Sequence, residues 1–159
     1  MAAFFNSKEL YRVAMEMERN GLAYYTGIAK NADDEQAGVI FDYLASSEKR
    51  HLKTFRKLWG NASKKKPPES YKGEYRQYVR ALIKDSVFPS PASAKSRAVR
   101  SGPGTALRTG IKAEKDSILF YTEMLDLVEP PDKKAVNRIL AEEKRHLRRL
   151  MEYKQSGCI

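Results

Sequence analysis

The pentapeptide Glu-Lys-Arg-His-Leu occurs twice in the chain, at Glu48–Leu52 and again at Glu143–Leu147. The sequence has only two histidines, His51 and His146, and each lies in one copy, three residues after a glutamate. On a helix, this spacing places both side chains on the same face, one turn apart. The two copies are 95 residues apart, which is too far for the period of a solenoid repeat. We therefore expect a fold that brings two distant helical segments face to face.

Apolar residues recur at intervals of three and four along four long stretches, which predicts helices at about 7–30, 34–59, 105–128 and 133–154. Ser7 and Asp132 are the expected N-caps of the first and last helices, and Asn31–Asp34 offers capping residues for the second. Short polar or Pro-containing turns separate the first helix from the second and the third from the fourth. Each of these pairs is therefore expected to form an antiparallel hairpin.

The remaining segment, 60–104, contains the run Lys64–Pro68, two shorter helical stretches, and Pro89 and Pro91, which should end the first of these stretches. It is long enough to cross a bundle from end to end. We predict an all-α protein, a four-helix bundle of two antiparallel hairpins joined by a long, partly helical crossover. The whole chain, 1–159, is expected to form one domain.

Ionisable residues lie at the centre of every predicted apolar seam. The first and third helices each carry a glutamate followed seven residues later by a tyrosine, and the second and fourth carry Glu-x-x-His. Packing the seams together would bury four carboxylates and two imidazoles, and each uncompensated charge costs several kcal/mol. Two divalent cations would balance the four carboxylates, and this ligand chemistry suits iron or manganese. The predicted metal ligands are Glu18, Glu48, His51, Glu114, Glu143 and His146.

The two seam tyrosines, Tyr25 and Tyr121, have two interpretations. Each could fill the core, and each could donate a hydrogen bond to a ligating carboxylate, because a buried hydroxyl needs a partner. The two interpretations are compatible.

Over nearly its whole length the chain resembles rubrerythrin and the rubrerythrin-like branch of the ferritin-like superfamily. The motifs that carry the resemblance are Glu18…Tyr25, Glu48-Lys-Arg-His51, Glu114-Lys-Asp-Ser-Ile-Leu-Phe-Tyr121 and Glu143-Lys-Arg-His146. The resemblance implies a di-iron centre, with Glu48 and Glu143 bridging two iron ions, Glu18 and Glu114 binding terminally, and one histidine on each ion. It also implies a reaction with hydrogen peroxide or dioxygen, and a homodimer.

The chain departs from that family in two respects. Rubrerythrins carry a rubredoxin domain with paired Cys-x-x-Cys motifs, whereas this chain has one cysteine, Cys158, which we expect to be inert. They also carry an extra glutamate one turn after the third-helix ligand, where this chain has Ser117. We therefore expect an external electron donor. The alternative functions are an iron-binding protein without turnover and a basic helical module that binds nucleic acid or an acidic partner.

The charge pattern bears on the last alternative. The net charge is +10, and residues 49–112 alone hold 17 Lys and Arg against 3 acidic residues. Without interleaved aromatic residues or a known binding motif, this excess is interpreted as solvated surface, so nucleic acid is not an expected partner. No apolar run reaches the length of about 18 residues that a membrane span requires, and the start lacks a signal-peptide pattern. A cytoplasmic location is the expectation.

Overall fold

The structure of the protein is a computed structural model that describes residues 6–62, 73–85 and 90–157. The Lys64–Pro68 run, Pro89 and Cys158 lie outside these ranges. The helices are α1 (Ser7–Lys30), α2 (Glu35–Asn61), α3 (Gly73–Lys84), α4 (Pro91–Arg100), α5 (Pro103–Leu127) and α6 (Lys133–Gln155), with a 3₁₀ turn at Pro130–Asp132 before α6. The four long helices lie within two residues of their expected bounds.

The N-cap of α1 is Asn6, not the expected Ser7. The Asn6 side chain accepts a hydrogen bond from the Glu9 amide at 2.9 Å, and the Glu9 carboxylate accepts one from the Asn6 amide at 3.0 Å. This reciprocal capping box satisfies two backbone donors, which Ser7 could not do because Leu10 stands three residues after it.

Of the other two expected capping residues, one caps its helix with its side chain and one does not. Asp34 caps α2 by accepting from the Ala37 amide at 2.8 Å, in agreement with the sequence. Asp132 stands at the N-cap position of α6, but its side chain caps nothing. Its carboxylate instead accepts a hydrogen bond from the Tyr11 hydroxyl at 2.5 Å, and this bond ties α6 to α1. Pro91 does not end a helix, because it begins α4, whose N-cap is Ser90.

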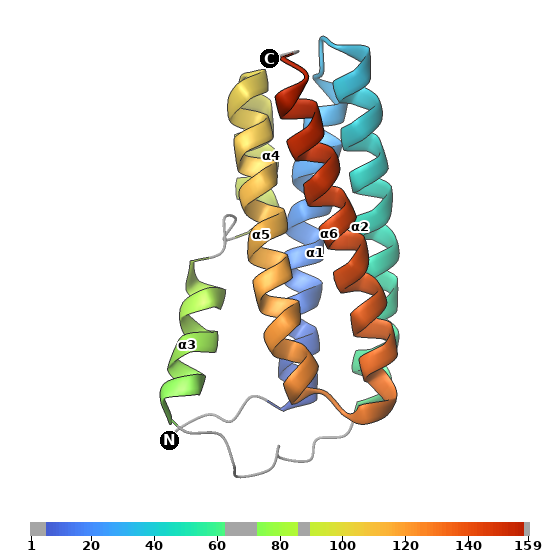
Figure 1. Cartoon of the computed structure of the whole chain (residues 1–159), viewed down its shortest axis with the longest axis vertical. Coiled ribbons are helices and arrows are strands. Elements are labelled where there is room, and N and C mark those ends of the chain that lie inside the picture. Colours follow the sequence, from blue (N-terminus) through green and yellow to red (C-terminus); the bar gives the residue numbers. More distant parts are fainter. Residues whose placement is uncertain (1–5, 63–72, 86–89, 158–159) are drawn as a thin grey trace.

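The two hairpins stand side by side as a bundle, with α1 and α2 behind α5 and α6 in Figure 1. The turn between α1 and α2 lies at the top of the view, and the turn between α5 and α6 lies at the bottom. The crossover helices pack on different partners: α3 lies beside the lower part of α5, and α4 lies near the top against α1. The close approach of α4 requires Gly27, since a β-carbon there would lie 2.7 Å from that of Ala98.

The core of the bundle consists of two apolar clusters, one toward each end. The upper cluster includes Tyr25, Phe41, Leu44, Leu107 and Leu150, and the lower cluster includes Tyr11, Phe55, Tyr121, Met124 and Val136. On each long helix, the ionisable seam residues lie between the members of these two clusters in sequence. The fold thus places a polar layer between two apolar layers.

None of the helices in the described ranges is both long enough and apolar enough to span a membrane.

Candidate metal centre

The structure brings all six sequence-predicted ligand residues into one buried layer at mid-bundle. Their relative exposures lie between 0% and 4%, so none of the six side chains is open to bulk water. Each helix supplies the residues that its seam predicted: Glu18 from α1, Glu48 and His51 from α2, Glu114 from α5, and Glu143 and His146 from α6.

The six residues form two overlapping groups, each with ligand atoms within 4.8 Å of one another. One group contains Glu18 and His51, and the other contains Glu114 and His146. Glu48 and Glu143 belong to both groups. This overlap is the geometry that two adjacent ions with two shared carboxylates require.

Both imidazoles turn Nδ1 toward the carboxylates. The His51 Nδ1 lies 2.8 Å from a Glu143 oxygen and 3.4 Å from a Glu18 oxygen. The His146 Nδ1 lies 3.5 Å from Glu114 and 3.7 Å from Glu48. The two rings stack with centroids 5.7 Å apart and planes inclined by 21°. The protein therefore aims one ring nitrogen from each half of the chain into the same space.

The hydrogen bonding of the layer tests whether these residues fit metal ions. Among the described residues, each of the six has at least one buried oxygen or nitrogen atom without a hydrogen-bond partner. Buried polar groups normally have hydrogen-bond partners. A cluster of buried carboxylate and imidazole atoms that point at one another without such partners is typical of metal ligands. Gly21 adds to the fit, because its missing side chain makes room for the Glu48 carboxylate. The residues present thus fit two cations.

Two tyrosines donate hydrogen bonds across the hairpins to the carboxylates of Glu18 and Glu114. The Tyr25 hydroxyl of α1 donates to Glu114 Oε1 of α5 at 2.5 Å, and the Tyr121 hydroxyl of α5 donates to Glu18 Oε1 of α1. Each bond occupies one carboxylate oxygen and leaves the other, Oε2, facing the layer without a partner. Both interpretations of the tyrosines therefore apply: each ring packs in an apolar cluster and each hydroxyl holds a carboxylate.

The electrostatics of Glu48, Glu143 and His51 favour proton uptake when no metal is bound. Burial, with the neighbouring carboxylates next, raises the pKa of Glu48 and of Glu143 well above the usual range. Burial alone would lower the pKa of His51, but the nearby carboxylates of Glu143 and Glu18 outweigh this and raise it to about 11. Burial also raises the pKa values of Tyr25 and Tyr121, so both hydroxyls remain protonated donors. Cations would replace protons in this layer.

Glu142 is a member of the site that the sequence analysis missed. Its Oε2 lies 2.9 Å from Nε2 of His51, on the side of the ring opposite the cluster. Burial alone would raise the pKa of Glu142, but the His51 bond and the charges of Arg50 and Arg145 outweigh it and lower the pKa. The available signal was its position directly before Glu143, since the pentapeptide is preceded by glutamate in one copy and by Ser47 in the other.

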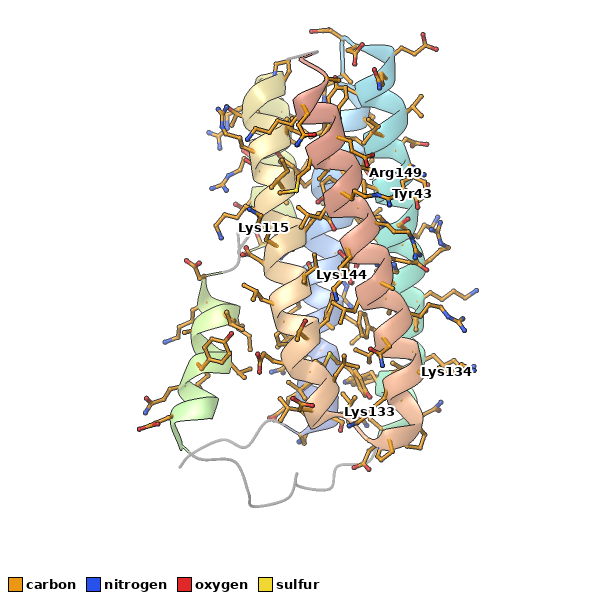
Figure 2. All side chains as sticks on the ribbon, viewed as in Figure 1. Tyr43, Lys115, Lys133, Lys134, Lys144 and Arg149 are labelled. Carbon is orange, nitrogen blue, oxygen red and sulfur yellow. The ribbon has the colours of Figure 1, made fainter. Side chains whose placement is uncertain are left out.

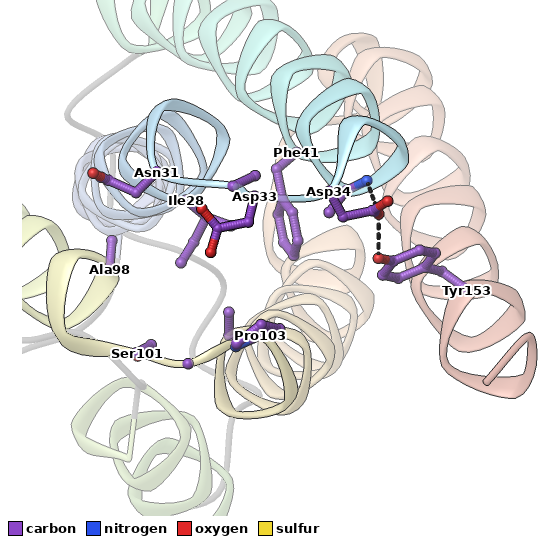
Figure 3. A pocket seen from close by; sticks show the side chains of 13 residues that line it. Ile28, Asn31, Asp33, Asp34, Phe41, Ala98, Ser101, Pro103 and Tyr153 are labelled. Atoms are coloured by element: carbon purple, nitrogen blue, oxygen red, sulfur yellow. Dashed lines mark hydrogen bonds between the residues drawn. The ribbon is translucent and has the colours of Figure 1, made fainter. Parts of the chain in front are cut away.

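A separate cavity of about 230 Å³ lies at the end of the bundle where α1 turns into α2 (Figure 3). Asp34 stands at its edge and accepts a hydrogen bond from the Tyr153 hydroxyl at 2.7 Å, while Phe41 forms part of the wall. None of the six clustered residues lines this cavity. The cavity is therefore distinct from the candidate metal centre.

These features define a class of protein: four-helix bundles with a carboxylate and histidine layer for a pair of metal ions. The sequence model of the rubrerythrin family matches residues 9–154 of the chain. The chain belongs to the rubrerythrin family.

Comparison with known proteins bears on the fold as well. The chain is similar to a protein from Thermotoga maritima whose crystal structure is described as that of a ferritin-like diiron-carboxylate protein. The two share 26% sequence identity with a TM-score of 0.72, over 99% of each chain. No curated protein matches the sequence. The prediction of an all-α, ferritin-like bundle is thereby confirmed.

Proposed function

We propose that the protein binds two iron ions in the mid-bundle layer and is an oxidoreductase that uses these ions to reduce hydrogen peroxide or dioxygen. The observation that carries the proposal is the pair of overlapping ligand groups that share Glu48 and Glu143. The structural neighbour, described as a diiron-carboxylate protein, supports iron as the metal. Manganese, which prefers the same ligands, is the alternative.

The residues of the chain would divide the work as follows. Glu18 and His51 would hold one ion and Glu114 and His146 the other, each histidine through Nδ1, and Glu48 and Glu143 would be shared between the two. Two ferrous ions held there would supply the two electrons that reduce hydrogen peroxide, with two protons, to two molecules of water.

Other residues around the layer would prepare it for this chemistry. Tyr25 and Tyr121 hold their carboxylates in place and keep a proton on each hydroxyl oxygen beside the layer. The apolar clusters above and below the layer exclude bulk water, which strengthens the electrostatic interactions inside it. A separate electron donor is needed to restore the ferrous state after each reaction. This donor, the homodimer and the cytoplasmic location stay predictions.

Anaerobic reconstitution with ferrous iron tests the proposal. We expect about two iron ions per chain by elemental analysis and a higher melting temperature, since a ligand at 100 times its Kd stabilises the folded state by about 2.7 kcal/mol per site. Hydrogen peroxide should then oxidise the iron rapidly, and Glu48→Ala should abolish both iron binding and oxidation. A chain that binds no ferrous iron and shows no shift in melting temperature would contradict the proposal.

Iron binding without turnover is the second candidate, and the near-complete burial of the six residues favours it, because a closed layer restricts access of substrate and donor. The two candidates differ in a turnover assay with excess peroxide and a small-molecule reductant. An oxidoreductase consumes many equivalents of peroxide per chain, whereas a binding protein consumes only the equivalents that its ferrous iron reduces.

A further inference from the structure

The two histidines share a pentapeptide but have different surroundings. The residue before each shared glutamate also differs: it is Glu142 in α6 and Ser47 in α2. A histidine that binds metal through one ring nitrogen normally donates its other N–H to a carboxylate or carbonyl, which fixes the ring and increases its basicity. Only one of the two histidines has such a partner in the described part of the chain.

His51 has the carboxylate. Its Nδ1 faces the cluster, and its Nε2 lies 2.9 Å from Glu142 Oε2. The Glu142 carboxylate lies beside two arginines, so it is ionised and can only accept a hydrogen bond. Nε2 of His51 is therefore the donor, and Nδ1 is left for a metal ion. Arg50 and Arg145 approach the Glu142 carboxylate from the surface to 3.9 Å and 3.8 Å.

His146 lacks one. Its Nε2 is buried and has no hydrogen-bond partner among the described residues. Ser47, the counterpart of Glu142, is fully buried, and its hydroxyl oxygen accepts a hydrogen bond from Arg50 at 2.8 Å. The Tyr43 ring meets the His146 ring edge-on, with centroids 5.7 Å apart.

The Tyr43 ring is itself held in place at this side of the bundle. The Arg149 guanidinium lies 4.2 Å from the centroid of the Tyr43 ring, and the two side chains meet between α2 and α6 in Figure 2. An aromatic ring braced by a cation therefore packs against His146, whereas a carboxylate bonds to His51.

We propose that the two metal positions are unequal, and that Glu142 makes the position of His51 the tighter one and the first to fill. The inference rests on the proposed function, because it concerns the same pair of ions. Glu142 accepts the Nε2 proton that His51 must keep when Nδ1 binds a metal. Among the described residues, His146 has no acceptor for the same N–H. Loss of such a partner typically lowers metal affinity about 10- to 100-fold, and we expect the two positions to differ by that factor.

Zinc titration followed by NMR of the imidazoles tests the order of filling, because the chain has only two histidines and zinc is diamagnetic. The metal-free full chain is labelled with ¹⁵N, and a His146→Asn variant assigns the two sets of signals. The first equivalent of zinc should shift the His51 signals alone, and the second should shift those of His146. Simultaneous shifts, or shifts of His146 first, would overturn the inference while leaving the proposed function intact.

Variants of Glu142 test the cause. Glu142→Gln keeps the size of the side chain, and it should lower the affinity of the first zinc step about 10- to 100-fold and remove the order of filling. Glu152→Gln is the matched control, since it makes the same change at an exposed position of α6 and should alter neither. Unchanged order in Glu142→Gln and in Glu142→Ala, both folded by circular dichroism, would overturn the role of Glu142. A parent chain that binds neither zinc nor ferrous iron would overturn the proposed function together with this inference.

Discussion

Substitution of Gly21 by alanine should raise the stability of the metal-free protein and lower that of the metal-loaded protein. Gly21 lies inside α1, where alanine is favoured over glycine by about 0.5–1 kcal/mol. The new β-carbon would lie 2.9 Å from Glu48 Oε2, about 0.5 Å inside the 3.4 Å at which ordinary contacts begin. The end of the Glu48 side chain is flexible, so the carboxylate moves aside when no metal holds it.

The cost appears when metal binds. The added β-carbon would displace the Glu48 carboxylate by about 0.5 Å, and a binding group must be held to within about that distance. Glu48 belongs to both ligand groups, so the displacement would affect both metal positions. A tenfold loss of affinity corresponds to about 1.4 kcal/mol, which exceeds the gain in helix stability. Without metal, the Gly21→Ala variant should therefore melt about 1–4 °C above the parent. At a metal concentration that saturates the parent, it should melt slightly below the parent.

Melting curves of both forms, with calorimetric metal titrations, check this expectation. Gly38→Ala is the matched control, because it is another helical glycine whose β-carbon would have neighbours no closer than 3.9 Å. The control should raise the melting temperature of both forms by similar amounts. If Gly21→Ala behaves like the control and binds metal as tightly as the parent, the placement of Glu48 in the metal centre is wrong.

Three further predictions concern the same layer. The folded chain keeps protons on Glu48, Glu143 and His51 above their unfolded pKa values. The metal-free protein should therefore lose stability as the pH rises from about 5 to about 11, and metal affinity should rise with pH; melting temperatures that stay constant across this range would argue against it. Tyr121→Phe removes a hydrogen bond to a buried carboxylate and should lower the free energy of unfolding by about 1.5–3 kcal/mol in urea titrations, whereas a change below about 0.5 kcal/mol would refute that bond. His146→Ala should leave about one ion per chain by elemental analysis, and retention of both would remove His146 from the ligand set.

The sequence predicts the fold well because the four seams are long and regular. A stripe of apolar residues at helical spacing over more than six turns leaves little freedom in the identity or bounds of a helix. The N-cap of α1 was missed by one residue for a local reason: Asn6 and Ser7 are both good caps, and Glu9 decides between them. The bond between Tyr11 and Asp132 joins residues 121 positions apart, and no local pattern indicates it.

For the candidate site too, some features could be predicted from the sequence and others could not. The spacing of Glu18, Glu48 and His51 and their counterparts places them on seams, and seams meet in any bundle, so their convergence could be predicted. The partner of His51 was missed. Its only sequence signal is that Glu142 stands directly before Glu143, and this position does not show that it reaches the outer edge of the ring from α6. Spacing along a helix indicates which face a residue occupies, but only packing decides which side chain it meets on another helix.

The distance between the two ions tests the central claim most directly. X-ray absorption at the iron edge of anaerobically loaded protein, with the iron content of the same sample, reports whether the ions are adjacent. Since Glu48 and Glu143 belong to both ligand groups, we expect about two iron ions per chain and an iron–iron vector of about 3.5–4 Å. A sample with one iron ion or fewer per chain, or with two ions and no such vector, would contradict a metal pair bridged by these two carboxylates.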